Sequence, residues 1–189
     1  MSRYEIRIAG MGGQGIVLAG VMIGRAASVF GGKHVTMAQS YGPESRGGAS
    51  KTEVVVSDER IDYPKVRKPS LIAIMSHEAY EKNLADLTQS DVVVIIDPDM
   101  VQEEEATKSR KIFRVPATRI AEGLGKRIVA NMVLVGAIVA LTGAVDPTAV
   151  EKAIAKYTPR GTEKLNLEAF KRGYEFAKQQ LSEPLVTAQ

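Results

Sequence analysis

Short apolar runs alternate with longer amphipathic stretches along the first two thirds of this chain. The short runs have the length of β-strands, and several are continuous, as is typical of strands covered on both faces. β-Branched residues are frequent in them, which favours the extended conformation. The sequence therefore predicts strands at residues 4–9, 33–37, 51–57, 71–75, 91–98 and 111–115.

The longer stretches have helical character and carry helix end signals. Ser76 stands at an N-cap position, Asp146 and Pro147 stand at N-cap and N1, and Gly143 follows the most apolar segment. These patterns predict helices at residues 16–30, 77–87, 117–124, 130–141, 147–157 and 163–181.

Strands that alternate with helices, followed by a helical C-terminal third, indicate the α/β class. We expect a single Rossmann-like three-layer domain with a largely parallel sheet and helices on both faces. A chain of 189 residues is long enough to bury one such core. We assign the domain to residues 1–182 and expect residues 183–189 to be a frayed tail.

The first thirty residues read as a strand, a glycine turn and a helix, the opening unit of nucleotide-binding α/β domains. The turn is Gly10-Met11-Gly12-Gly13-Gln14-Gly15. The helix that follows offers free N–H groups to an anion. A dinucleotide site also needs an acidic residue after the second strand, where this chain has Thr36-Met37-Ala38-Gln39. The missing acid argues against bound NAD or FAD.

A second glycine-rich segment, residues 39–50, combines three glycines and a proline with an aromatic, a carboxylate and a guanidinium. Its composition predicts a loop. One interpretation is a structured turn in which Glu44 and Arg46 are solvated or cap neighbouring backbone. The other is a loop that presents Tyr41, Glu44 and Arg46 to a ligand or a partner surface, since an arginine grips phosphate or carboxylate with two hydrogen bonds.

Composition excludes several classes of function. The chain has no cysteine, so disulfides, thiolate nucleophiles and cysteine-ligated iron–sulfur or zinc sites are ruled out. The net charge is only +3, and no basic cluster is interleaved with aromatic residues, which argues against nucleic acid. The apolar stretch at 128–145 is too interrupted for a membrane span and predicts a buried helix. We expect a cytoplasmic protein with no membrane partner.

No self-contained catalytic set is visible. Ser40, Ser45 and Ser50 have no histidine nearby in the sequence, and His34 and His77 are isolated. The glycine turn lacks the Lys-Ser/Thr pair of a P-loop. These observations predict a binding scaffold that supplies no catalytic residue and no metal ligand of its own.

Two motifs carry a family resemblance: Gly10-Met11-Gly12-Gly13-Gln14-Gly15-Ile16 and Ser40-Tyr41-Gly42-Pro43-Glu44-Ser45-Arg46-Gly47-Gly48. Together they resemble the gamma subunit of 2-oxoacid:ferredoxin oxidoreductases. Pro116-Ala117, and Asn131-Met132 with Gly136, are similar to later signatures of that family. The resemblance covers nearly the whole chain.

The resemblance implies a multi-subunit enzyme that oxidatively decarboxylates a 2-oxoacid to an acyl-CoA and reduces ferredoxin. Alpha and beta subunits and a ferredoxin-like delta subunit would be its partners. Thiamine diphosphate and [4Fe-4S] clusters would lie in those partners, coenzyme A would be the co-substrate, and this chain would hold no cofactor and be inactive alone. The pattern favours the 2-oxoglutarate type, although pyruvate, ketoisovalerate and indolepyruvate enzymes share the motifs.

The same resemblance implies that the glycine-rich loops lie at a junction with the thiamine-binding subunits, with Glu44 and Arg46 near the substrate or coenzyme A channel. An alternative hypothesis is a free nucleotide- or phosphate-binding Rossmann-like module that uses the helix N-terminus at residues 13–16. The candidate ligand- or subunit-interface residues are Gly10, Gly12, Gly13, Gln14, Gly15, Tyr41, Gly42, Pro43, Glu44, Ser45, Arg46, Gly47, Gly48 and Asn131.

Overall fold

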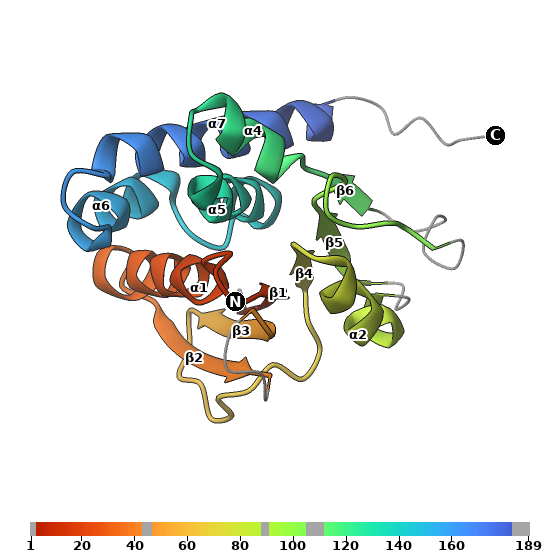
Figure 1. Ribbon diagram of the computed structural model, residues 1–189. Helices are drawn as coiled ribbons and strands as arrows, with labels where there is room; N and C mark the ends of the chain where they lie inside the picture. Colours follow the sequence, from red (N-terminus) through yellow and green to blue (C-terminus); the bar gives the residue numbers. More distant parts are fainter. Residues whose placement is uncertain (1–2, 43–46, 88–90, 105–111, 183–189) are drawn as a thin grey trace.

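A computed structural model describes residues 3–42, 47–87, 91–104 and 112–182. The chain folds around one six-stranded sheet, with helices on both of its faces (Figure 1). The α/β class, the alternation of strands and helices, and the helical C-terminal third are as predicted.

The sheet has the strand order β2-β3-β1-β4-β5-β6. β1, β4, β5 and β6 run parallel to one another, whereas β3 is antiparallel to both of its neighbours, β1 and β2. The sheet is thus largely parallel, with one reversed strand inserted beside β1. The strands are β1 (Arg3–Met11), β2 (His34–Tyr41), β3 (Ala49–Ser57), β4 (Leu71–Ile74), β5 (Val93–Ile96) and β6 (Ile112–Arg114).

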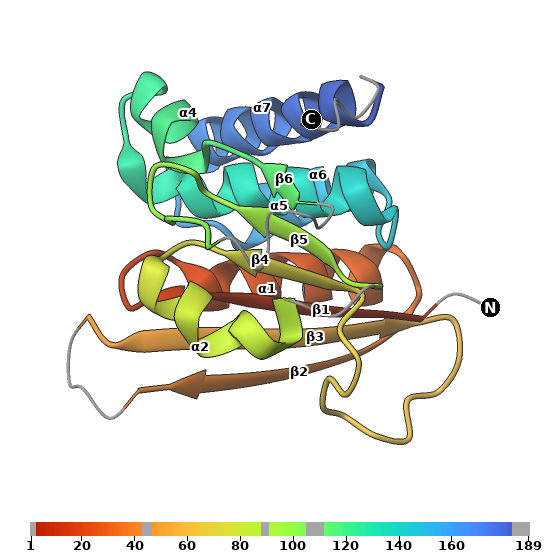
Figure 2. The ribbon, with the colours of Figure 1, turned by 90° about the vertical axis from the view of Figure 1, so that its right-hand side faces the viewer.

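Helices α1 and α5 pack on one face of the sheet and α2 packs on the other, while α7 lies on the outer side of α5 (Figures 1 and 2). The π-helical segment η1 extends α1, and the short 3-10 segment η2 leads into α5. The helical segments are α1 (Ile16–Arg25), η1 (Ala26–Phe30), α2 (His77–Leu87), α4 (Ala117–Gly123), η2 (Arg127–Val129), α5 (Ala130–Thr142), α6 (Pro147–Tyr157) and α7 (Glu163–Ser182).

The predicted bounds of the second strand, 33–37, and of the loop after it, 39–50, were wrong, although both elements are present. β2 continues to Tyr41 and β3 begins at Ala49, because the two strands pair from His34↔Ser57 to Tyr41↔Ser50. Ladder hydrogen bonds to a neighbouring strand outweigh the weak β-propensity of serine and glutamine. The insertion of β3 also separates β2 from β1, so the opening segment does not form the β1-α1-β2 unit of a dinucleotide-binding domain.

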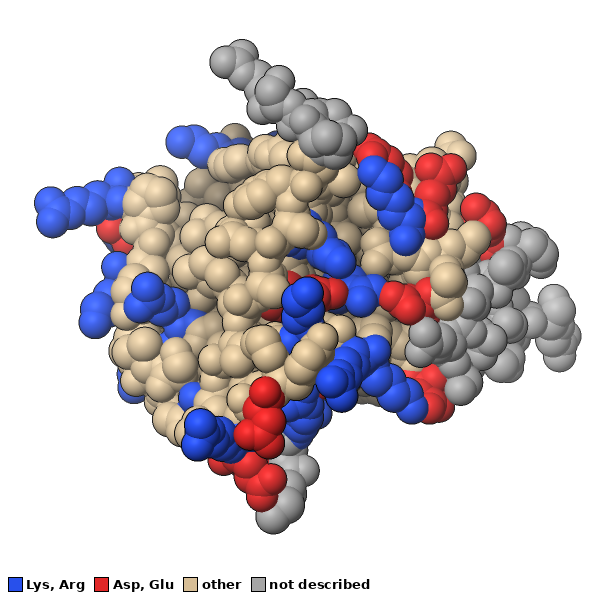
Figure 3. Space-filling view, turned by 90° about the horizontal axis from the view of Figure 1, so that it is seen from below, with Lys and Arg blue, Asp and Glu red and all other residues tan. Residues whose placement is uncertain are grey.

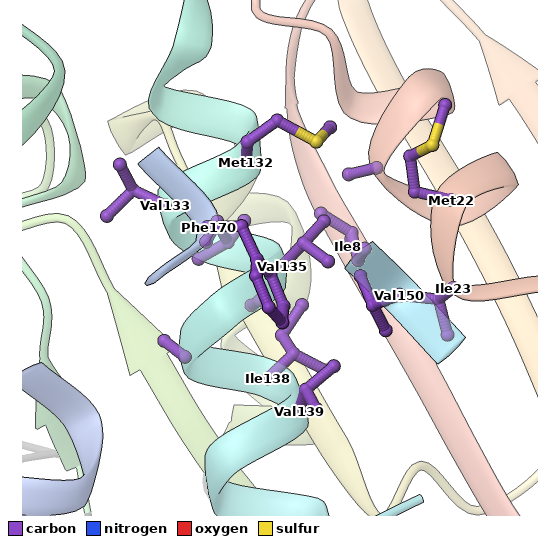
Figure 4. Close-up of a cluster of buried hydrophobic side chains, with 14 of the residues drawn as sticks. Ile8, Met22, Ile23, Met132, Val133, Val135, Ile138, Val139, Val150 and Phe170 are labelled. Carbon is purple, nitrogen blue, oxygen red and sulfur yellow. The ribbon is translucent and has the colours of Figure 1, made fainter. Parts of the chain in front are cut away.

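Helix α5 is the centre of the larger core, since its residues 130–139 are all buried (Figure 4). Its side chains meet Ile8 of β1, Met22 and Ile23 of α1 and Phe170 of α7. An apolar helix buried on every side fits the interior of a three-layer domain. Within the described part of the chain, no helix combines the length and apolar character that crossing a membrane requires.

Charged side chains tie α2 to the opposite face of the sheet, which Figure 3 shows with basic and acidic groups interspersed. The Arg7 guanidinium, whose side chain is 12% exposed, donates to Glu53 of β3 at 2.9 Å. It also donates to Asp86 and Asn83 of α2. Its hydrogen bonds with several partners compensate for the removal of its charge from water.

Glu5 anchors the connection between β3 and β4 in a similar way. Its buried carboxylate accepts hydrogen bonds from the backbone N–H groups of Arg67 at 2.7 Å and Lys68 at 3.0 Å, and from the Arg3 guanidinium. Burial raises the pKa of this carboxyl, but the hydrogen bonds from Arg3, Arg67 and Lys68 outweigh burial and leave the pKa below its usual value.

Glycine contacts set the distance between α5 and α7. A Cβ added at Gly136 would overlap the carbonyl oxygen of Phe170, and one added at Gly173 would overlap that of Val133. Backbone atoms cannot move aside as side chains do. The two helices are therefore as close as glycine permits.

We predict that Gly136→Ala lowers the free energy of unfolding by about 1–3 kcal/mol, the usual range for overpacking a core. The measurement is a urea unfolding curve followed by circular dichroism. Gly123→Ala is the matched control, because a Cβ at this exposed helix position meets nothing within 4 Å. It should leave stability unchanged or raise it slightly. Equal stability of the Gly136→Ala variant and the wild type would contradict the prediction.

Candidate functional site

The two glycine-rich segments meet at the carboxyl edge of β1. The Gly12 N–H donates to the Gly48 carbonyl oxygen at 2.7 Å, and the Gly42 N–H donates to that of Ala49 at 2.7 Å. The contact follows from the reversed direction of β3, which starts where β1 ends. The expected proximity of the two loops is therefore present in the fold.

Gln14 holds the glycine turn to the neighbouring parallel strand. Its side-chain Oε1 accepts from the Met11 N–H at 2.7 Å, and its Nε2 donates to the Met75 carbonyl oxygen at 2.7 Å. Met75 directly follows β4. The amide thus bridges the ends of β1 and β4, and its polar atoms hold the backbone of the site in place.

Gly15 is the N-cap of α1, with a left-handed backbone (φ 72°) and no side-chain cap. Asn131, in the first turn of α5, donates from Nδ2 to the Gly15 carbonyl oxygen at 3.2 Å. A Cβ at Gly15 would lie 2.9 Å from Asn131 Cγ. Glycine at this position therefore satisfies the backbone conformation and leaves room for the asparagine.

This contact brings the N-termini of α1 and α5 together. The first N–H groups of a helix have no intrahelical partner and carry the positive end of its dipole. A cavity of about 260 Å³ opens beside them, with the half-exposed Arg127 on its wall. This arrangement suits an anionic group such as a phosphate or carboxylate. The cavity is lined by Gly13, Gln14, Met75, Thr118, Arg127, Ile128 and Ala130.

The structure places the predicted residues in three groups. Gly10, Gly12, Gly13, Gln14 and Gly15 form the end of β1 and the turn after it, and Tyr41, Gly42, Gly47 and Gly48 flank the adjoining loop. Asn131 joins them from α5. Pro43, Glu44, Ser45 and Arg46 lie outside the described residues, so the positions expected for Glu44 and Arg46 stay predictions.

The sequence did not indicate the residues of the segment between α4 and α5. Ile128 is 60% exposed although it starts the longest apolar run of the chain, and Arg127 and Thr118 also line the cavity. An apolar run by itself does not reveal which end of it is exposed. A tandem of Lys126 and Arg127 before a buried helix was the one available signal.

Asp97 and His77 contact groups that shape the local structure. The fully buried Asp97 carboxylate accepts from the N–H groups of Asp99 at 3.1 Å and Thr118 at 2.8 Å, as a turn-forming aspartate does. His77 begins α2 with its Nε2 3.7 Å from Glu81 Oε1. Among the described residues, no group of three or more His, Cys, Asp or Glu side chains could hold a metal ion.

A second cavity, of about 230 Å³, lies on the α2 side of the same edge. Lys51 of β3 and Lys82 and Asn83 of α2 line it, with Ser40 and Tyr41 of β2. Lys51 lies 3.5 Å from Glu53, and Lys82 pairs with Glu78. The two cavities flank the glycine turn, one on each face of the sheet.

Comparison with known proteins gives consistent matches. The family model described as "Pyruvate ferredoxin/flavodoxin oxidoreductase" matches residues 5–176. The 2-oxoglutarate synthase subunit KorC of Methanothermobacter marburgensis is 51% identical over 92% of this chain and 96% of its own length. The ketoisovalerate oxidoreductase subunit VorA of Methanothermobacter thermautotrophicus is 31% identical over 94% of this chain but only 37% of its own length.

A solved structure matches the fold along nearly all of its length. The gamma subunit of keto/oxoacid ferredoxin oxidoreductase from Geobacter sulfurreducens aligns with a TM-score of 0.80 and 40% identity. The alignment covers 92% of this chain and 98% of that one. Both lengths therefore correspond to the same unit.

We predict that Gly15→Ala destabilises the chain more than Gly13→Ala does. Both positions have positive φ, so each variant pays the backbone strain of about 1–2 kcal/mol. Only at Gly15 does the added Cβ also meet Asn131, whereas nothing lies within 4 Å at Gly13. The measurement is the urea unfolding midpoint of each variant.

A double variant separates strain from overlap. Asn131→Ala in the Gly15→Ala background should recover part of the loss, so that the two substitutions are not additive. If the changes in the free energy of unfolding caused by the two substitutions simply add, the overlap between Gly15→Ala and Asn131 does not contribute to the loss of stability.

Proposed function

Because this chain belongs to the pyruvate ferredoxin/flavodoxin oxidoreductase family, we propose that it is the gamma subunit of a 2-oxoacid:ferredoxin oxidoreductase that acts on 2-oxoglutarate. The assignment of 2-oxoglutarate as the substrate rests on sequence identity, which is 51% to a 2-oxoglutarate synthase subunit and 31% to a ketoisovalerate oxidoreductase subunit. A free nucleotide-binding module is the weaker reading, since β3 occupies the place beside β1 that a dinucleotide unit gives to its second parallel strand.

The overall reaction of such an enzyme has three parts. A 2-oxoacid loses carbon dioxide, its acyl group is transferred to the coenzyme A thiol, and the two electrons released reduce two ferredoxins, with one proton liberated. Alpha, beta and ferredoxin-like delta subunits hold the thiamine diphosphate and the [4Fe-4S] clusters in this proposal. The absence of cysteine from this chain supports that division, because cluster ligands must then come from a partner.

This chain contributes a docking surface at the carboxyl edge of its sheet. Met11 and Ile128 are 37% and 60% exposed there, around the glycine turn. Large exposed apolar side chains grouped beside a cavity are typical of protein interfaces. The VorA relative adds support, since the same domain is about a third of a longer polypeptide and is covalently joined to other parts.

Coenzyme A is placed at the same edge in this proposal. Its phosphates fit the cavity between the N-termini of α1 and α5, where the positive end of the α1 dipole and the Arg127 guanidinium favour negative charge, although the Ala130 N–H at the start of α5 already donates to the Arg127 carbonyl oxygen. Arg127 is 3.9 Å from Glu122 and donates from Nη2 to Met100 Sδ at 3.1 Å. Its side chain is 60% exposed, so these two surface contacts can be exchanged for an anion.

We predict that Ile128→Lys reduces the yield of the assembled complex about tenfold when the chain is co-expressed with its partner subunits and recovered through an affinity tag on a partner. A charged side chain replaces an apolar contact without altering the fold of an exposed segment. Leu181→Lys, at a comparably exposed position of α7, is the matched control and should leave the yield unchanged.

The outcomes of that experiment separate two parts of the proposal. Recovery of both variants at the wild-type level would place the interface elsewhere on this chain. If the wild-type chain itself recovers no thiamine- and cluster-bearing subunits and supports no 2-oxoglutarate-dependent reduction of ferredoxin, the gamma-subunit assignment is wrong.

For coenzyme A, we predict that Arg127→Gln in the assembled enzyme raises the KM for coenzyme A about tenfold, or ~1.4 kcal/mol. The KM for 2-oxoglutarate should not change. Arg160→Gln, in the exposed turn between α6 and α7, removes the same charge far from the cavity and serves as control. An equal rise in both KM values, or no rise in either, would contradict the binding of coenzyme A in this cavity.

A further inference from the structure

β2 is an open edge of the sheet. It is eight residues long, and among the strands of the described residues it pairs with β3 alone, so no described strand lies on the other side of its backbone. The Ala38 carbonyl oxygen accepts from Thr52 Oγ1, and the Gly42 N–H donates to β3, so the even-numbered residues turn their backbone groups toward β3. The odd-numbered residues Val35, Met37, Gln39 and Tyr41 therefore turn theirs outward, as alternation in an antiparallel ladder requires.

The opposite edge of the sheet is protected. β6 has three residues, and its Arg114 forms an ion pair with Glu103. The Gln180 side chain of α7 donates from Nε2 to the Arg114 carbonyl oxygen at 3.0 Å. Short length, a charged side chain and a covering group are the usual means by which proteins prevent pairing at a sheet edge.

β2 has neither a short length nor a charged side chain. The segment between β3 and β4 contacts it at Thr36, whose hydroxyl donates to the Pro64 carbonyl oxygen at 2.9 Å, but this contact is made by a side chain and not by the outward backbone groups of β2. The sequence of β2, His34-Val35-Thr36-Met37-Ala38-Gln39-Ser40-Tyr41, contains no Lys, Arg, Asp, Glu or Pro. Met37 and Tyr41 are 37% and 67% exposed, and Val29 of the adjacent segment η1 is 48% exposed. A long, neutral edge with exposed apolar side chains favours the addition of another strand.

We propose that β2 pairs with β2 of a second copy of this chain, antiparallel and with the two-fold axis at Ala38. The two sheets then become one continuous sheet. This register places the outward backbone groups of Met37 opposite those of Gln39 of the second copy, and those of Val35 opposite those of Tyr41. By the antiparallel pattern these four symmetric pairs form roughly eight backbone hydrogen bonds.

The side chains of β2 complement themselves in this register. On the face that α1 covers, Val35 meets the Tyr41 ring of the second copy, a favourable pairing of a β-branched with an aromatic residue. On the other face, Thr36 lies opposite Ser40 of the second copy. The Thr36 hydroxyl donates to the Pro64 carbonyl oxygen at 2.9 Å, so its oxygen can accept from the Ser40 hydroxyl. A two-fold axis at Met37 would instead place Lys33 opposite Tyr41 and leave Val35 beside Gln39. The axis at Ala38 is therefore the better match.

The chain contains no cysteine, so a single introduced thiol tests the register directly. In Ala38→Cys the two thiols face each other at a pair without direct hydrogen bonds, where the Cα atoms are about 4.5 Å apart. That distance lies within the range of a disulfide. With oxidised glutathione as the oxidant, the full-length variant should form a covalent dimer in high yield, read on a non-reducing gel.

Gln39→Cys is the matched control. Its thiol lies opposite Met37 of the second copy and about 8–9 Å, Cα to Cα, from its own counterpart, beyond the reach of a disulfide. Sedimentation of the wild-type chain should independently give the mass of a dimer. Protection of the amides of residues 34–41 from hydrogen exchange should rise with protein concentration.

Two results would overturn the proposal. One is a wild-type chain that sediments as a monomer at every concentration, with no cross-link in Ala38→Cys. The other is cross-linking of Gln39→Cys at least as efficient as that of Ala38→Cys, which would exclude the register. All measurements use the full chain alone, so their outcome does not depend on the proposed enzymatic function.

Discussion

The reversed strand β3 is the constraint on which the rest of this structure depends. It is the one strand that runs against its neighbours, and its position between β1 and β2 has three consequences. Its first residues lie beside the end of β1, which brings the two glycine-rich segments into hydrogen-bonding contact. It occupies the place in which a dinucleotide-binding unit has its second parallel strand. It also moves β2 to the edge of the sheet, where β3 is its neighbour among the described strands.

A second constraint is the depth at which α5 is buried. This helix is covered by α1 on one side and α7 on the other. Its contacts with both neighbours include glycine and asparagine residues. Gly136 and Gly173 allow backbone contact with α7, and Asn131 reaches the N-cap of α1. The packing of the core thereby fixes where the two helix N-termini converge, and the candidate anion site is a by-product of that packing.

The chain has the character of a component whose chemistry is completed by other subunits. The described residues form a stable scaffold with an apolar rim, a cavity that suits an anion and no metal-binding cluster. Its family membership agrees with that character, since the family's model covers residues 5–176 and a gamma subunit of known structure shares the fold over 92% of this chain. The two proposed interfaces, at the carboxyl edge and along β2, both lie on the surface of this scaffold.

The sequence by itself determined the type and order of most elements, because these follow from local features. The boundaries of α2 and the start of α6 after Asp146-Pro147 were predictable from capping residues and periodicity. The glycine motifs sufficed for the family. Only the tertiary structure decided the direction of β3, the length of β2, the exposure of Ile128 and the contact between Gly15 and Asn131. Each of these depends on groups far apart in the sequence, where ladder hydrogen bonds and burial outweigh local preference.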